Sequence, residues 1–329
     1  MARAFDASRK EAALAKLARQ RLAGRVAPDA PMSAATSFGI GGPADILVRP
    51  ACVQDIVKVV RLCRRERYPL VTLGGGTNVL VLDGGIRGVV MMLGGQLSEL
   101  RRQSGKIYAG AGARLMDAAR FAQSAGLTGI EFACGIPGSV GGGVCMNAGA
   151  YGREMKDIVA RSVFIGEDGE VGAADAAAHA FGYRSSWFLG GAGGGNMSGG
   201  KAGGGGANAI IIETEFDLTQ GDPAAIQVVM DELDARRSSS QPLDLPSAGS
   251  VFRRPEGAHV GPMVEACGLK GYAVGGAQVS EMHSGFIVNR GGATARDVRS
   301  VIAHVQEAVQ ARFGVLLDTE LRVIGEDTA

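Results

Sequence analysis

The sequence is poor in the residue types that build disulfide frameworks, zinc sites and membrane spans. Among its 329 residues are four histidines and five cysteines, which are Cys52, Cys63, Cys134, Cys145 and Cys267. The odd cysteine count, with no C-x-x-C and no H-E-x-x-H pattern, argues against a disulfide framework and a zinc site. No run of about 18 apolar residues occurs, which argues against a membrane-spanning helix.

Net charge is also nearly absent. Lys and Arg total 34, Asp and Glu total 33, and the formal charge is +1, so no overall field attracts nucleic acid or acidic membranes. Residues 1–24 mix charges with Ala and Leu, lack the apolar stretch of a secretion signal and predict a short exposed helix. We expect a cytoplasmic protein that neither binds nucleic acid nor inserts into membranes, and no obligate protein partner is evident.

Glycine, in contrast, is abundant, with 52 residues against a usual share of roughly 7%. The low-complexity stretch at 190–207 predicts a disordered insertion that is neutral for catalysis. The other glycines concentrate in three loops that each follow a predicted strand, namely LGGGTNVL at 73–80, AGAGARL at 109–115 and GIPGSVGG at 135–142. Amides exposed in such loops bind phosphate oxygens.

Each glycine loop taken singly remains ambiguous. Gly74 and Gly76, like Gly110 and Gly112, match the dinucleotide pattern G-x-G-x-x-G only in part, and tight turns explain them equally well. Three such loops in adjacent lobes together indicate one long ligand with an extended pyrophosphate.

Apolar periodicity predicts an α+β chain. Residues 44–93 are typical of a β-α-β-β lobe, with Val53, Ile56, Val57, Val60 and Cys63 on one helix face. Further helices are expected in the last part of 106–126 and over 222–237, 260–271 and 294–314. The helix at 222–237 carries a predicted stripe of Ile226, Val229, Met230 and Leu233. In the last helix, Thr294 and Asp297 suit a capping box and Gly314 a C-terminal stop. We expect a turn-rich loop at 247–257 and strands across 315–325.

Seven stretches, in this order, resemble the UDP-N-acetylenolpyruvoylglucosamine reductases. They are SFGIGGPADILV, LGGGTNVLV, GIPGSVGGGVCMNAGAYG, FGYRSSWF, AGSVFRRPEG, CGLKGYAVGGAQVSEMHSGFIVN and DTELRVIG. The resemblance runs from about Ser37 to Gly325 and is broken only by the glycine insertion. Without the extra lid segment of the longer subtype, the chain is similar to the shorter one.

The resemblance implies an α+β fold. A two-lobed FAD-binding domain of the vanillyl-alcohol-oxidase type precedes a C-terminal α+β domain that binds substrate. The implied divisions are an N-terminal helix and extension at 1–36, lobe 1 at 37–93, lobe 2 at 94–219 with the insertion inside it, a substrate-binding domain at 220–325 and a tail at 326–329.

The resemblance also implies a reaction in peptidoglycan precursor synthesis. NADPH reduces non-covalently bound FAD, and the flavin N5 then delivers hydride to the enolpyruvyl methylene carbon, which converts UDP-N-acetylglucosamine enolpyruvate to UDP-N-acetylmuramate. Ser250 would donate the proton, Arg184 would polarise the carboxylate, and Glu320 would orient or relay the proton. Spacing alone suggests a turn serine, an arginine at a strand edge and an outward glutamate.

Further site residues follow from the same resemblance. The implied cofactor-binding residues are Gly74, Gly75, Gly76, Thr77, Asn78, Gly135, Ile136, Pro137, Gly138, Ser139, Gly141, Gly142, Asn147, Ala148 and Gly149. The implied substrate-binding residues are Tyr183, Arg254, Lys270, Gln278 and His283. No metal is implied.

Two other functions fit parts of the sequence. A sugar or alcohol oxidase on the same FAD scaffold would pass electrons to oxygen, but should lack the set Arg184, Ser250 and Glu320. A nucleotide-sugar-binding regulator that has lost catalysis would have no reason to keep all three. Consumption of NADPH with and without the enolpyruvyl sugar separates these interpretations.

Overall fold

The computed structural model describes residues 5–190, 197–198 and 209–328, and it divides into two compact units. Unit 1 comprises Met1–Pro28, Ile46–Gly75 and Gly88–Ala235. Unit 2 comprises Asp29–Asp45, Gly76–Arg87 and Arg236–Ala329. Each unit buries a hydrophobic core of its own. The lobe boundaries expected from the sequence stay a prediction.

The first part of unit 1 contains the predicted helices and a mixed sheet. A four-stranded sheet has the order β1-β2-β5-β3, with β3 and β5 parallel. Strands β1, β2 and β5 each run across the boundary between the units. The bounds are α1 Ala7–Arg19, β1 Arg25–Pro31, β2 Pro43–Arg49, α2 Val53–Glu66, β3 Leu70–Leu73 and β5 Ile86–Met92. Helix α2 buries Ile56, Val60 and Cys63 as predicted, and burial raises the pKa of Cys63 to about 12.

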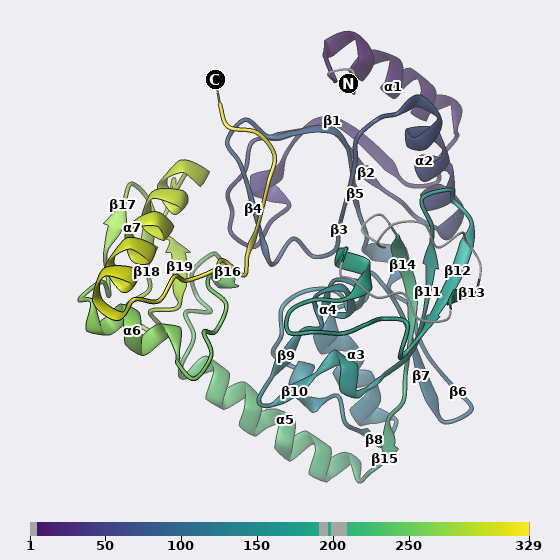
Figure 1. Cartoon of the computed structure of the whole chain (residues 1–329). Coiled ribbons are helices and arrows are strands. Elements are labelled where there is room, and N and C mark those ends of the chain that lie inside the picture. The colour runs from purple at the N-terminus through teal and green to yellow at the C-terminus, as the bar shows by residue number, and fades with distance from the viewer. Residues whose placement is uncertain (1–4, 191–196, 199–208, 329) are drawn as a thin grey trace. The chain divides into compact units, whose positions relative to one another are not determined.

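The second part of unit 1 is a six-stranded antiparallel sheet (Figure 1). The strand order is β13-β12-β11-β14-β7-β6, helix α4 contacts β14 and β7, and helix α3 contacts α4. The bounds are β6 Leu100–Gln103, β7 Lys106–Gly110, α3 Leu115–Ser124, α4 Val140–Met146, β11 Val159–Ile165, β12 Val171–Asp175, β13 Met197–Ser198 and β14 Ile210–Phe216. The predicted pair of strands around the turn at 167–169 is confirmed by the antiparallel pairing of β11 with β12.

Short strand pairs complete unit 1. Strand β9 pairs with β10, and β8 pairs with β15. Their bounds are β8 Leu127–Thr128, β9 Gly149–Ala150, β10 Arg153–Glu154 and β15 Thr219–Gln220. Helix α5 (Pro223–Ser238) runs on across the unit boundary. It buries Ile226 and Met230 as predicted, whereas Val229 is exposed, so the buried stripe is narrower than the periodicity suggested.

The glycine insertion is described only in part. Met197 and Ser198 form β13, which pairs with Ala174 and Ala173 of β12. These two residues therefore differ from the fully irregular insertion that composition favoured. Residues 191–196 and 199–207 of the insertion lie outside the described residues, and so does the prediction that they are disordered.

Unit 2 combines a four-stranded antiparallel sheet with a separate parallel pair. The sheet order is β16-β19-β18-β17, and β20 pairs with β4. The bounds are β4 Val79–Val81, β16 Ser247–Ser250, α6 Val260–Ala266, β17 Ala273–Val274, β18 Ala277–Val279, β19 Phe286–Asn289, α7 Ala295–Phe313 and β20 Arg322–Ile324. Helix α7 lies against β17 and β18 and buries the predicted valine stripe (Figure 1).

Two predictions about unit 2 were wrong. Ser247–Ser250 is strand β16 rather than a turn-rich loop, because an irregular register and the positive φ of Gly249 (78°) make a bulged strand resemble a turn. Within residues 315–325 only Arg322–Ile324 forms a strand, since the preceding stretch pairs through a single bridge between Thr319 and Phe252.

Three further features of the described residues concern membrane spans, metal ligands and thiols. None of the described helices has the length and apolarity to cross a membrane. No group of three or more potential metal ligands occurs in that part of the chain. All five cysteines are free thiols.

The capping box of α7 gives a stability prediction. Thr294 accepts the Asp297 N–H at 3.1 Å, and Asp297 accepts the Thr294 N–H at 3.0 Å. We expect Thr294→Ala to lower the free energy of unfolding by about 1 kcal/mol. Urea denaturation measures this loss. Ser300→Ala on the same helix is the matched control, because its hydroxyl only bonds back to the Arg296 carbonyl. Equal effects of the two variants would contradict the capping role.

Candidate active site

Residues from all three glycine loops contact one another within unit 1. A Cβ on Gly74 would lie 2.2 Å from the Ser139 hydroxyl oxygen, so the first and third loops touch. The Val140 N–H donates to the Ala113 carbonyl at 2.8 Å, and the Gly141 N–H donates to the Ala111 carbonyl at 2.9 Å. These bonds join the second loop to the third. The three loops that the sequence analysis assigned to one long ligand are therefore in contact, and the ligand itself stays a prediction.

Several of these glycines are explained by close packing alone. A Cβ on Gly110 would lie 2.2 Å from the Leu97 carbonyl oxygen, and one on Gly112 would lie 2.7 Å from the Gly94 Cα. A Cβ on Gly141 would lie 2.8 Å from that of Ala111. The turn interpretation therefore accounts for the AGAGARL loop, and in α4 glycine lets the helix approach its neighbours.

Amides that are available to a ligand remain in the stretch that precedes α4. In the described part of the chain, the N–H groups of Gly135, Gly138 and Ser139 donate to no acceptor. Pro137 is exposed, and Gly138 has a φ of 125°, a conformation that glycine adopts freely. A short segment with three unused donors and little side-chain bulk has the chemistry of an anion cradle.

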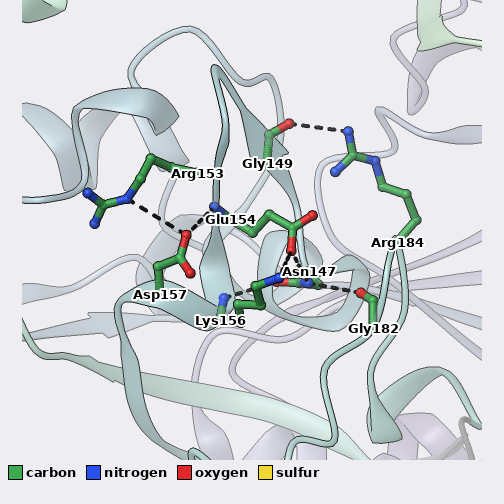
Figure 2. Close-up of polar contacts among 8 residues, drawn as sticks. All are labelled: Asn147, Gly149, Arg153, Glu154, Lys156, Asp157, Gly182 and Arg184. Carbon is green, nitrogen blue, oxygen red and sulfur yellow. Dashed lines mark hydrogen bonds and ion pairs between the residues drawn. The ribbon is translucent and has the colours of Figure 1, made fainter. Parts of the chain in front are cut away.

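Tyr183 and Arg184 belong to unit 1 and lie in a turn rather than at a strand edge. Gly182 and Ser185 exchange backbone hydrogen bonds across this turn at 3.0 and 3.2 Å. Arg184 has a φ of 51°, which is uncommon for a residue with a side chain. Its guanidinium donates to the Gly149 carbonyl at 3.2 Å (Figure 2). It also lies over the Tyr183 ring.

Asn147 is buried instead of facing outward. Its side chain is 0% exposed, and its amide nitrogen donates to the Gly182 carbonyl at 2.9 Å and to Glu154 at 3.0 Å. Its oxygen accepts the Lys156 N–H at 2.9 Å (Figure 2). This differs from the expected cofactor contact, because the side chain uses its donors within the chain. Glu154 was missed, because it lies two residues beyond the glycine-rich stretch that ends at Gly152.

Ser250 and Glu320 come together in unit 2 through the backbone. The Glu320 N–H donates to the Val251 carbonyl at 2.7 Å, and Arg253 donates to the Asp318 carbonyl at 2.8 Å. The Asn78 side-chain amide donates to the Glu320 carbonyl at 3.3 Å. Three implied site residues, which are far apart in the sequence, therefore occupy adjacent backbone segments.

Gly285 lies beneath Ser250 and His283. A Cβ at this position would lie 3.5 Å from the Ser250 hydroxyl oxygen and 3.0 Å from the His283 ring. The His283 Nδ1 accepts the Gly285 N–H at 3.1 Å, which leaves the proton of the neutral ring on Nε2. Burial lowers the pKa of His283 from 6.5, with an opposing contribution from Glu265. Gly285 was not singled out from the sequence, since only its neighbours show its role.

The other implied substrate residues are spread over unit 2. Lys270 pairs with Glu265 at 3.6 Å, and the Gln278 amide donates to the Gly271 carbonyl at 3.1 Å. Arg254 contacts the His259 ring. Of the implied cofactor residues, Gly74 and Gly75 belong to unit 1, while Gly76, Thr77 and Asn78 belong to unit 2.

The contact between Gly74 and Ser139 yields a paired prediction. Gly74→Ala forces the Ser139 hydroxyl away from the Gly142 N–H that it caps at 3.3 Å, and we expect a loss of about 1–3 kcal/mol in stability. Because the clash is with the hydroxyl alone, Gly74→Ala should cost clearly less in a Ser139→Ala background. Urea denaturation of the four proteins completes the cycle. Gly94→Ala, at a position with nothing within 4 Å, is the control. Additive losses would argue against this contact.

The buried histidines predict how stability depends on pH. Burial lowers the pKa values of both His283 and His179 from 6.5 in the folded chain. The unfolded chain therefore binds protons more readily, and stability falls as the pH drops below about 6.5 toward the folded pKa values. We expect His283→Gln to show a smaller fall in melting temperature between pH 7 and 5.5 than the original chain. An unchanged slope would remove His283 from this account.

Comparisons with known proteins cover nearly the whole chain. A family model described as an FAD binding domain matches residues 44–175. A model described as the C-terminal domain of UDP-N-acetylenolpyruvoylglucosamine reductase matches residues 241–324. The predicted α+β fold, with an FAD-binding domain followed by a C-terminal domain of this type, is confirmed.

Similar whole proteins carry the same description. The UDP-N-acetylenolpyruvoylglucosamine reductase of Clostridium perfringens (strain SM101 / Type A) is 44% identical over 91% of this chain and 93% of its own length. That of Listeria innocua is 42% identical over 90% of this chain and 94% of its own. The crystal structure of UDP-N-acetylenolpyruvylglucosamine reductase from Thermus caldophilus superimposes with a TM-score of 0.75 at 30% identity and covers 92% of this chain and 99% of that one. The chain therefore belongs to the UDP-N-acetylenolpyruvoylglucosamine reductases, a family of FAD-dependent oxidoreductases.

Proposed function

We propose that this protein reduces UDP-N-acetylglucosamine enolpyruvate to UDP-N-acetylmuramate in peptidoglycan precursor synthesis, with NADPH as the reductant and bound FAD as the carrier. The observation that carries the proposal is the backbone hydrogen bond between Glu320 and Val251. This bond joins the segment of Glu320 to the segment of Ser250, and both residues belong to the implied active site. Family membership supports the same reaction. The proposal places the enzyme in the cytoplasm, where NADPH is made and used.

The residues of unit 1 fit FAD. The unused N–H groups of Gly135, Gly138 and Ser139 are donors of the kind that a pyrophosphate requires. Gly75 is exposed in the adjoining loop and adds backbone without side-chain bulk. We assign the holding of FAD to these residues. The chemistry that bound FAD supplies is hydride transfer from NADPH to the enolpyruvyl methylene carbon.

Ser250 is suited to deliver the proton that completes the reduction. Hydride addition to the methylene carbon leaves negative charge on the neighbouring carbon, which must then be protonated. Ser250 is half-buried, and its hydroxyl donates to the Phe252 carbonyl over a long distance of 3.4 Å. This weak hydrogen bond lets the O–H turn toward a substrate. Gly285 leaves space beside this hydroxyl, where any Cβ would intrude. The proton therefore passes from the Ser250 oxygen to the carbon.

Arg184 and Glu320 would stabilise the charges of this step. A guanidinium stays charged at any working pH and binds a carboxylate with two hydrogen bonds, so Arg184 suits the carboxylate into which the negative charge spreads. Glu320 is half-buried next to the segment that follows Ser250. A carboxylate there can orient the serine hydroxyl or restore its proton.

Single-turnover kinetics of Ser250→Ala test the proposal. Under anaerobic conditions, NADPH should reduce the flavin of the variant at the original rate, because no proton from Ser250 is needed. Reoxidation by the enolpyruvyl sugar should slow by about 10²- to 10⁴-fold. Ser247→Ala, on the same strand, is the matched control and should leave both steps unchanged.

Two results would count against the proposal. If the original protein binds no flavin, or if its NADPH-reduced flavin is not reoxidised by the enolpyruvyl sugar, the reaction is wrong. If Ser250→Ala slows both half-steps equally, the reaction can stand, but Ser250 is not its proton donor.

A further inference from the structure

The turn that carries Tyr183 and Arg184 depends on support from outside itself. Arg184 has a φ of 51° in the left-handed region, which a residue with a side chain keeps only when its surroundings hold it. Within the turn, Gly182 and Ser185 supply only their two mutual backbone bonds. The neighbouring segment at 145–156, here called the clamp segment, makes further contacts with the turn.

Asn147 is the central contact of the clamp segment. Its amide nitrogen donates to the Gly182 carbonyl at 2.9 Å, and its side chain is 0% exposed. Two further bonds fix which way the amide faces. Its nitrogen also donates to Glu154 at 3.0 Å, and its oxygen accepts the Lys156 N–H at 2.9 Å. Since an ionised carboxylate only accepts, Glu154 keeps the amide nitrogen directed toward the turn.

Contacts on both sides of Asn147 complete the clamp. The Ser186 hydroxyl donates to the Cys145 carbonyl at 2.7 Å, just beyond the turn. The Arg184 guanidinium donates to the Gly149 carbonyl at 3.2 Å (Figure 2). Glu154 is itself held by Lys156 at 2.8 Å, and it caps the short helical turn that begins at Met155. The backbone of the turn at Gly182 and the side chain of Arg184 are thus both held by the clamp segment.

We propose that Asn147, oriented by Glu154, is a positioning residue for Arg184. It holds the turn in the conformation from which the guanidinium meets the charge that develops on the substrate. The inference rests on the proposed function, because the charge to be met is that of the reduced enolpyruvyl group. It assigns Asn147 a role through Arg184 rather than through the cofactor.

The first test separates the two half-steps. Asn147→Gly keeps a residue that tolerates the left-handed backbone of this position (φ 45°) but removes the amide. Flavin content and reduction by NADPH should stay within about twofold of the original protein. Reoxidation by the enolpyruvyl sugar should slow about 10- to 100-fold, the scale of a misplaced catalytic group. An original reoxidation rate, or equal slowing of both half-steps, overturns the inference.

A double-variant cycle with Arg184→Ala tests whether the effect runs through the arginine. If Asn147 acts only by placing Arg184, adding Asn147→Gly to Arg184→Ala should slow reoxidation by less than about twofold. If the two substitutions instead slow reoxidation by factors that multiply in the double variant, the inference is overturned. If Asn147→Gly does not fold, the pair Asn147→Asp with Glu154→Gln takes its place, because it restores the bond between the two side chains but gives the Gly182 carbonyl no donor.

Hydrogen exchange supplies a readout that does not need the reaction. We expect the peptide covering residues 181–189 to exchange faster in Asn147→Gly than in the original protein. Arg153→Gln is the matched control. Arg153 also lies in the clamp segment, but it pairs with Asp157 and points away from the turn (Figure 2). Unchanged exchange overturns the clamp. If the original protein fails to reoxidise with the enolpyruvyl sugar, the proposed function fails, whereas this exchange result still judges the clamp.

Discussion

Two backbone hydrogen bonds, from Glu320 to Val251 and from Arg253 to Asp318, determine how the segments that carry Ser250 and Glu320 meet in unit 2. They attach a stretch near the chain's C-terminal end to the end of β16. Asn78 adds a side-chain bond to the same stretch. Ser250, Glu320 and the bare backbone of Gly285 are then fixed relative to one another by the backbone of these segments.

Glycine contributes to unit 1 in two physically different ways. At Gly110, Gly112 and Gly141, a Cβ would strike neighbouring backbone or a neighbouring Cβ, so the missing side chain permits close packing. At Gly135 and Gly138 the backbone instead keeps unused N–H donors. The high glycine content therefore has two causes, which are close packing at some positions and exposed backbone donors at others. Only the assignment of each donor to an acceptor separates the two.

Local signals in the sequence were sufficient for most elements and for the fold class. The capping box of Thr294 and Asp297, the stop at Gly314 and the valine stripe of α7 are confirmed because each depends on residues within a few turns. The strand at Ser250 was missed because Gly249 bends it. Strand β4 was missed because its three residues gain their identity only from the distant β20. The site residues came from the family resemblance, since the burial of Asn147 and its link to Glu154 depend on tertiary contacts that spacing does not reveal.

The interleaved segments of the two units also constrain how the chain is made. Val79–Val81 pairs in parallel with Arg322–Ile324, and Asp83 accepts the N–H groups of Ala295 and Arg296. During synthesis Asp83 has to wait for partners that are made 212 and 213 residues later. The core of unit 2 therefore cannot close on a growing chain until the stretch that contains Arg322–Ile324 has left the ribosome, which makes its assembly a long-range step.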